Sequence, residues 1–272
     1  MIRFDSVTKR YPDGTVAVDG FSHVVPSHEL HVLLGSSGCG KTTLLRMVNR
    51  MVDPTSGAVW IDDENVADLD PVALRRRIGY VMQSGGLLPH RTVLDNVATV
   101  PVLTGVGRRR ARTAALGLLE RVGLDAQLAS RYPSQLSGGQ RQRVGVARAL
   151  AADPLILLMD EPFGAVDPVV RTELQQELLS IQADLAKTIL FVTHDVDEAF
   201  LLGARVLVMT EGGHVAQEGT PDQILLHPAD DFVDSFIGGP RRHLAVRRDG
   251  GTTTVVDADG HLVGRLDAAE SA

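Results

Sequence analysis

Four short, mainly apolar segments of the chain each run directly into a glycine or a polar residue. They are residues 30–34, interrupted only by His31, and residues 78–82, 155–159 and 188–193. Segments of this kind are typical of strands that are buried on both faces of a parallel sheet. The residues that follow them are Gly35, Gln83, Asp160 and His194. Because ligands bind beyond the carboxyl ends of parallel strands, we expect these residues along one edge of the sheet.

Other parts of the chain have different periodicities. Residues 1–25 alternate apolar and polar positions around Pro12-Asp13-Gly14, which predicts two antiparallel strands joined by a tight turn, and residues 58–61 predict another short strand. Between residues 88 and 152 the pattern is helical, with Thr92 as an expected N-cap and helices over residues 108–128 and 141–152. The sequence therefore predicts an α/β protein with an N-terminal antiparallel β subdomain and an inserted α-helical subdomain.

The composition is that of a globular protein and limits its partners. The chain has 272 residues, of which 44% are hydrophobic, enough for one large domain or two modest ones. A net charge of -7 argues against a broadly basic surface, so no nucleic-acid partner is expected. The single cysteine, Cys39, excludes an internal disulfide and a cysteine-built zinc site. Apolar runs are far shorter than the roughly 18 residues of a membrane span, and no secretory leader is visible, so we expect a cytosolic chain.

Residues 35–42 match the phosphate-binding pattern G-x-x-x-x-G-K-[ST], between an apolar segment and an expected helix over residues 42–51. Glycines let backbone N–H groups turn toward a phosphate, and the dipole of the following helix favours the anion. We expect Lys41 to reach the β- and γ-phosphates and the Thr42 hydroxyl to bind Mg²⁺. The residues expected to contact nucleotide are Gly35, Ser36, Ser37, Gly38, Cys39, Gly40, Lys41, Thr42 and Thr43. A glycine-rich turn that binds nothing is the alternative, which the strand-loop-helix context disfavours.

Two further stretches carry chemistry suited to phosphates. Asp160 and Glu161 follow a buried strand, where paired carboxylates are costly unless they hold a cation or take part in acid–base chemistry. Asp160 suits Mg²⁺, and Glu161 suits the polarisation of an attacking water. Ser137-Gly138-Gly139-Gln140 precedes a helical run and predicts a second helix N-terminus able to hold an anion. Tyr11 and His194 are ambiguous on local sequence, since each also fits a purely structural role.

In their order along the chain these motifs resemble the nucleotide-binding subunit of an ABC transporter, over residues 1–238. The most specific element is Leu136-Ser137-Gly138-Gly139-Gln140, the signature of that family, between a phosphate loop and the Asp160-Glu161 strand. The resemblance implies that Tyr11 stacks on adenine and that His194 contacts the γ-phosphate. Ala165-Val166-Asp167 matches the family's D-loop, with valine where leucine is usual.

The resemblance also implies the fold and the assembly of the site. A RecA-like P-loop NTPase core would comprise residues 1–87 and 153–238, with the helical subdomain over residues 88–152. ATP and Mg²⁺ are the implied cofactors. Gln83 would contact both Mg²⁺ and the attacking water, beside Thr42 and Asp160 at the metal and Glu161 and His194 in catalysis. A head-to-tail homodimer is implied, in which each ATP lies between Lys41 of one copy and Ser137 and Gly139 of the other.

A weaker likeness concerns the cargo. Residues 79–83, 86–93 and 192–199 are similar to bacterial importers of quaternary amines such as glycine betaine, choline, carnitine and proline. This likeness implies an ATPase at the cytoplasmic face of the cell membrane. A membrane permease would dock between Ser84 and Pro101, with an extracytoplasmic substrate-binding protein as an indirect partner. Import of another small solute, such as amino acids, and a soluble ABC ATPase without transport stay open as alternatives.

Residues 239–272 depart from the family pattern, in which many importer ATPases continue into paired CBS domains. Residues 252–266 predict a β-hairpin around Asp259-Gly260 and also resemble one hairpin of a CBS module. About 30 residues are too few for an independent core. We therefore expect a packed accessory hairpin or a frayed tail.

Overall fold

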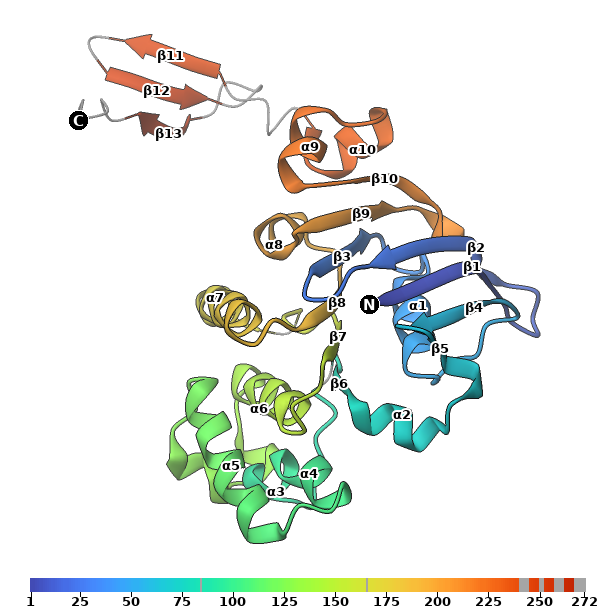
Figure 1. Ribbon diagram of the computed structural model, residues 1–272. Coiled ribbons are helices and arrows are strands. Elements are labelled where there is room, and N and C mark those ends of the chain that lie inside the picture. The colour runs from blue at the N-terminus through green and yellow to red at the C-terminus, as the bar shows by residue number, and fades with distance from the viewer. Residues whose placement is uncertain (84, 165, 240–244, 250–251, 257–261, 267–272) are drawn as a thin grey trace. The chain divides into compact units, whose positions relative to one another are not determined.

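The computed structural model describes residues 1–83, 85–164, 166–239, 245–249, 252–256 and 262–266. The chain divides into two compact units, Met1–Pro221 and Asp222–Ala272. The first unit contains two β-sheets and a group of helices (Figure 1). It ends earlier than residue 238, the boundary suggested by the family resemblance, and that boundary stays a prediction.

The larger sheet has the strand order β10-β9-β3-β8-β7-β6. Its parallel strands are β3 (Leu30–Gly35), β6 (Ile78–Val81), β7 (Ile156–Asp160), β8 (Thr188–Thr193) and β9 (Arg205–Met209). The edge strand β10 (Val215–Gly219) is antiparallel to β9. β3, β7 and β8 are buried along their whole length, which explains why apolar runs predicted them.

The smaller sheet is antiparallel and has the order β2-β1-β4-β5. Its strands are β1 (Ile2–Arg10), β2 (Val16–Val25), β4 (Ser56–Ile61) and β5 (Glu64–Asn65). The predicted pairing of the first two strands around Pro12-Asp13-Gly14 is confirmed. Helix α1 (Lys41–Val48) contacts strands of both sheets, and its Leu44 and Leu45 share one hydrophobic core with Phe4 of β1 and Leu190 of β8. The phosphate loop is therefore anchored on both sides.

Helices α3, α4, α5 and α6 form a group beside β6 (Figure 1). They span Val93–Val97, Thr99–Leu103, Arg108–Arg121 and Gly138–Leu150, with short 3₁₀ turns at Ala126–Ser130 and Pro133–Gln135. Among the described residues from 88 to 152 there is no strand, as predicted. Thr92 caps α3 by accepting a hydrogen bond from Asp95 N, which confirms that expectation.

Two predicted helices end at least three residues earlier than expected. α1 stops at Val48 instead of residue 51, because Asn49 is its C-cap and Arg50 adopts a left-handed conformation with φ 55°. α5 stops at Arg121 instead of residue 128, just before Gly123 with φ 66°. Periodicity continues through such breaks and does not reveal them.

The remaining helices of the first unit complete its layers. α7 (Pro168–Leu185) and α8 (Val196–Leu202) lie on the side of the larger sheet away from the smaller one (Figure 1). α2 (Pro71–Arg77) begins at Asp70, whose side chain accepts from Ala73 N as expected of a cap. 3₁₀ turns occur at Val66–Asp68 and Glu211–Gly213. Within the described part of the chain, no helix is both long and apolar enough to cross a bilayer.

The second unit carries a small sheet of its own. Its strands β11 (Ala245–Asp249), β12 (Thr252–Val256) and β13 (Leu262–Leu266) are antiparallel in that order. The expected pairing within residues 252–266 is confirmed by β12 and β13, whereas its turn at Asp259-Gly260 lies outside the described residues. β11 was not predicted. Helix α9 (Pro221–Leu226) begins at the boundary between the units, and α10 (Asp231–Phe236) follows it.

Candidate nucleotide-binding site

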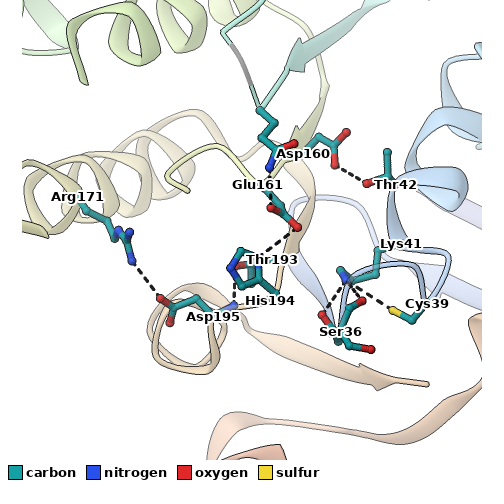
Figure 2. A network of polar contacts seen from close by, with 12 residues as sticks. Ser36, Cys39, Lys41, Thr42, Asp160, Glu161, Arg171, Thr193, His194 and Asp195 are labelled. Carbon is teal, nitrogen blue, oxygen red and sulfur yellow. Dashed lines mark hydrogen bonds and ion pairs between the residues drawn. The ribbon is translucent and has the colours of Figure 1, made fainter. Parts of the chain in front are cut away.

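The carboxyl ends of β3, β6, β7 and β8 bring the predicted chemistry together. β3 leads into residues 35–42, β7 ends at Asp160, and β8 is followed by His194. Gln83 follows β6, and its side chain reaches Glu161. Figure 2 shows Lys41, Thr42, Asp160, Glu161 and His194 close to one another beyond the strand ends. The residues that follow the four apolar segments therefore lie along one edge of the larger sheet, as predicted.

Gly40 joins the phosphate loop to α1, at a position where only glycine fits. It is the N-cap of α1, with φ 106°. A Cβ at this position would lie 2.4 Å from the Ala17 carbonyl oxygen and 3.2 Å from Val18 Cγ2, both in β2. The loop therefore approaches the backbone of the small sheet too closely for any other residue.

Lys41 places its positive charge inside the loop. The side chain is buried, and Nζ donates hydrogen bonds of 2.7 Å to the carbonyl oxygens of Gly35 and Ser36 (Figure 2). Nζ also lies 3.6 Å from the sulfur of Cys39, which is itself fully buried. An ammonium fixed at the centre of a glycine-rich loop is suited to an anionic ligand.

Thr42 and Asp160 present oxygen atoms to each other next to the loop. Thr42 Oγ1 donates to Asp160 Oδ1 at 2.7 Å, and Asp160 is only 5% exposed. Hydroxyl and carboxylate oxygens are the ligands that Mg²⁺ prefers, so these residues fit that ion. In the described part of the chain no three His, Cys, Asp or Glu side chains form a cation site. A magnesium ion here would need further oxygen ligands, which nucleotide phosphates and water can supply.

Glu161 is contacted by two other predicted catalytic residues. Gln83 Nε2 donates to Glu161 Oε2 at 2.9 Å, and His194 Nδ1 lies 3.2 Å from Oε1. The Glu161 backbone adopts φ 45°, which is uncommon outside glycine, and its N–H donates to Val192 O at 2.9 Å. A strained conformation of this kind is retained where the surroundings fix it, often at functional sites.

A second network lies behind His194. Asp195 caps α8 by accepting from Glu198 N, and its Oδ2 accepts from Arg171 Nη1 of α7 at 3.0 Å (Figure 2). Burial raises the pKa of the Glu198 carboxyl, which Gln175 of α7 hydrogen-bonds at 3.2 Å. The segment that carries His194 is thus tied to α7 at two points.

Tyr80 and Arg46 belong to the site although the sequence patterns did not reveal them. The Tyr80 hydroxyl donates to Asp160 Oδ2 at 3.2 Å, and Arg46 Nη2 lies 3.7 Å from the same oxygen. Burial raises the pKa of Tyr80, so its hydroxyl keeps the proton that it donates. One signal was available for Arg46: it follows Thr42 by four residues, which places both on one face of α1.

The predicted signature residues lie elsewhere in the first unit. Ser137 caps α6, its Oγ accepts from Gln140 N at 3.2 Å, and the Gln140 side chain accepts from Ser137 N at 3.0 Å. Gly139 packs against α7, where an added Cβ would lie 3.0 Å from Val170 Cγ1. The N-terminal end of α6 belongs to the helical group, whereas the phosphate loop belongs to the sheet core (Figure 1). The two motifs are not brought together within one chain.

The structure also describes two other predicted site residues, Tyr11 and Asp167. Tyr11 lies in the turn between β1 and β2, is 37% exposed, and has Lys9 Nζ 5.4 Å from its ring centroid. Asp167 precedes α7, and its carbonyl oxygen accepts from Arg171 N at 2.8 Å. Ala165 of the expected D-loop lies outside the described residues.

Comparison with known proteins places these features in a family. The family model described as ABC transporter matches residues 18–164, more than half of the chain. The choline transport ATP-binding protein OpuBA of Bacillus subtilis is 47% identical over 241 residues, which cover 89% of this chain and 63% of OpuBA. The glycine betaine uptake system ATP-binding protein YehX of Escherichia coli is 49% identical over 247 residues, covering 91% of this chain and 79% of YehX.

A solved structure agrees with the sequence matches. The dimeric ABC transporter cassette MJ0796 is similar with a TM-score of 0.76 and 35% identity, over 81% of this chain and 99% of MJ0796. The chain spans about six-tenths of the length of OpuBA and of the OpuCA proteins that it resembles. The family model covers most of the first unit, and the relatives OpuBA and YehX are nearly half identical to this chain. The chain belongs to the ABC transporter family.

Proposed function

We propose that this chain is the ATP-hydrolysing subunit of an ABC importer. The observation that carries the proposal is the grouping of Gln83 and His194 around Glu161, next to the buried Lys41 and the Thr42–Asp160 pair. Family membership alone does not identify the catalytic side chains. The grouping supports assigning them to particular residues.

Nucleotide binding is assigned to the loop and to the small sheet. Residues Gly35 to Thr43 hold the phosphates through backbone N–H groups, the α1 dipole and Lys41. The exposed ring of Tyr11 stacks on adenine. Thr42, Asp160 and Gln83 hold Mg²⁺, which neutralises charge on the phosphates when bound.

We assign hydrolysis to Glu161, with Gln83 and His194 as the residues that contact its carboxylate. Glu161 accepts a proton from the attacking water as the water oxygen bonds to the γ-phosphorus and the bond to ADP breaks. The hydrogen bond from Gln83 and the contact with His194 hold the carboxylate in place for this transfer. His194 also contacts the γ-phosphate, so it senses whether the nucleotide is intact.

The complete site is assigned to two copies of the chain. Helix α6 begins at the signature residues Ser137, Gly138, Gly139 and Gln140, in the helical group and away from the phosphate loop of the same chain. We therefore assign the α6 N-terminus to binding the γ-phosphate held by a partner copy. Support comes from MJ0796, described as dimeric and also as a post-hydrolysis dimer bound to ADP and Pi. Asp167, just before α7, lies at the same dimer interface.

The transport partners are assigned from the relatives. OpuBA, OpuCA and YehX are named as transport proteins for choline, glycine betaine or carnitine, so the proposed cargo is an osmoprotectant of this quaternary amine class. An integral membrane permease would dock between Ser84 and Pro101 and hold the chain at the cytoplasmic face of the membrane. Ser84 itself lies outside the described residues. A substrate-binding protein outside the membrane would deliver the cargo.

Uptake by cells tests this proposal. Cells lacking the chain, and cells that express either wild type or Lys41→Ala, are given labelled glycine betaine, choline, proline and an unrelated amino acid. We expect wild type alone to restore uptake of quaternary amines. If wild type restored uptake of only the unrelated amino acid, the proposed cargo would be wrong. If wild type changed the uptake of none of these solutes, the result would argue for an ABC ATPase without transport.

A further inference from the structure

The two oxygens of Asp160 have different and specific partners. Oδ1 accepts from the Thr42 hydroxyl at 2.7 Å, which is the side of the proposed metal. Oδ2 accepts from the Tyr80 hydroxyl at 3.2 Å and lies 3.7 Å from Arg46 Nη2. The carboxylate is 5% exposed, so water contributes little to its solvation. Its orientation is therefore determined by these three neighbours.

The three partners come from two elements on either side of Asp160. Tyr80 lies in β6, the parallel neighbour of β7, and pairs with Leu158 two residues before Asp160. Thr42 and Arg46 are one turn apart on α1, so both face β7. The Tyr80 hydroxyl and the Arg46 guanidinium thus both approach the same atom, Asp160 Oδ2.

A buried carboxylate that offers one oxygen to a metal must have its other oxygen satisfied by the protein. A donor on Oδ2 limits rotation of the carboxylate and keeps Oδ1 toward Thr42. Such partners behind a metal ligand orient the ligand and raise the affinity for the metal. Neither Tyr80 nor Arg46 lies in the phosphate loop, the signature or the Asp160-Glu161 motif.

We propose that Tyr80, supported by Arg46, is a positioning residue that orients Asp160 toward the divalent cation of the bound nucleotide. This inference rests on the proposed function, since it assumes a metal–nucleotide complex at the loop. It adds that cation affinity depends on a hydroxyl in β6. Deleting one hydrogen bond behind a metal ligand is expected to weaken cation binding about 3- to 10-fold.

A purely structural role for Tyr80 is the competing explanation, because its ring packs against the hydrophobic core. Tyr80→Phe separates the two, since it keeps the ring and deletes only the hydroxyl. Tyr132→Phe is the matched control: Tyr132 is 45% exposed and lies in the helical group. Arg46→Lys is a second variant that keeps the charge but loses the guanidinium contact with Asp160 Oδ2. Thermal unfolding followed by circular dichroism checks that each variant is folded.

The test measures cation binding instead of turnover. Mn²⁺, as a probe for Mg²⁺, is titrated into each full-length protein at saturating ADP, and free Mn²⁺ is read by electron paramagnetic resonance. We expect Tyr80→Phe to weaken Mn²⁺ binding about 3- to 10-fold and Arg46→Lys by a smaller factor, with metal-free ADP binding and Tyr132→Phe unchanged. Mn²⁺ binding by Tyr80→Phe equal to wild type would overturn the positioning role alone. Failure of wild type to bind ADP would instead overturn the proposed function and this inference together.

Discussion

Replacement of Gly40 by alanine tests how strictly the phosphate loop is fixed. A Cβ at Gly40 would lie 2.4 Å from Ala17 O, and contacts below 3.0 Å are essentially never seen for real Cβ atoms. The contacted atom is backbone, which cannot swing aside as a side chain can. Either β2 or the loop must therefore move, and a moved loop no longer aims its N–H groups at the phosphates.

Three contributions determine how much Gly40→Ala lowers the free energy of unfolding. The left-handed conformation at φ 106° costs an alanine about 1–2 kcal/mol, and the forced backbone shift adds about 1–3 kcal/mol, as overpacking does. Reduced freedom of the unfolded chain offsets about 0.4–1 kcal/mol. We therefore expect Gly40→Ala to lower the free energy of unfolding by about 3 kcal/mol and to weaken ATP binding at least tenfold.

Gly105 provides the control, because it has a similar φ of 96° but no atom within 4 Å of an added Cβ. Gly105→Ala should lose only about 1 kcal/mol and bind ATP normally. Urea unfolding, followed by fluorescence of the single tryptophan, Trp60, measures stability, and a fluorescent ATP analogue measures binding. Equal losses of stability in both variants, or normal ATP binding by Gly40→Ala, would refute the close contact with β2.

Lys41→Ala removes the ammonium from the loop, so calorimetry should detect little ATP binding, and wild-type affinity would contradict the phosphate assignment. Burial lowers the pKa of His23 from 6.5 to about 4, so the unfolded chain binds more protons between these pH values. The free energy of unfolding should thus fall by up to about 3 kcal/mol as the pH drops from 6.5 to 4. His23→Gln should reduce the change in the free energy of unfolding between pH 6.5 and 4. The same pH dependence in His23→Gln and wild type would contradict the assignment to His23. Cys39 is fully buried, so a thiol reagent should react much more slowly with native than with unfolded chain, and equal rates would contradict that burial.

The parts of the site on buried strands could be predicted from local sequence. Asp160 and His194 each follow a run of apolar residues, and burial on both faces makes such runs recognisable. The phosphate loop and the Ser137 cap were predictable because their chemistry depends on residues close in sequence. In these cases a short segment determines the structure almost alone.

The contacts between distant elements could not be predicted in this way. Tyr80 meets Asp160 only because β6 and β7 are neighbours in a particular register, and one sequence does not specify that register. Arg171 meets Asp195 only because α7 packs next to α8. The strands β9 and β10, between residues 205 and 219, were not predicted either. Tertiary packing, not local propensity, decides these features.

Under the proposed function, Glu161 activates water in an ATP site shared by two copies of the chain. Glu161→Gln keeps the size and the hydrogen bonding of the side chain but removes its ability to accept a proton. The molar mass of this variant in solution, measured by light scattering with and without MgATP, is the most direct test. We expect a monomer without nucleotide, a stable dimer with MgATP, and almost no phosphate release. A variant that stays monomeric with bound MgATP, or hydrolyses it at the wild-type rate, would refute the proposed function.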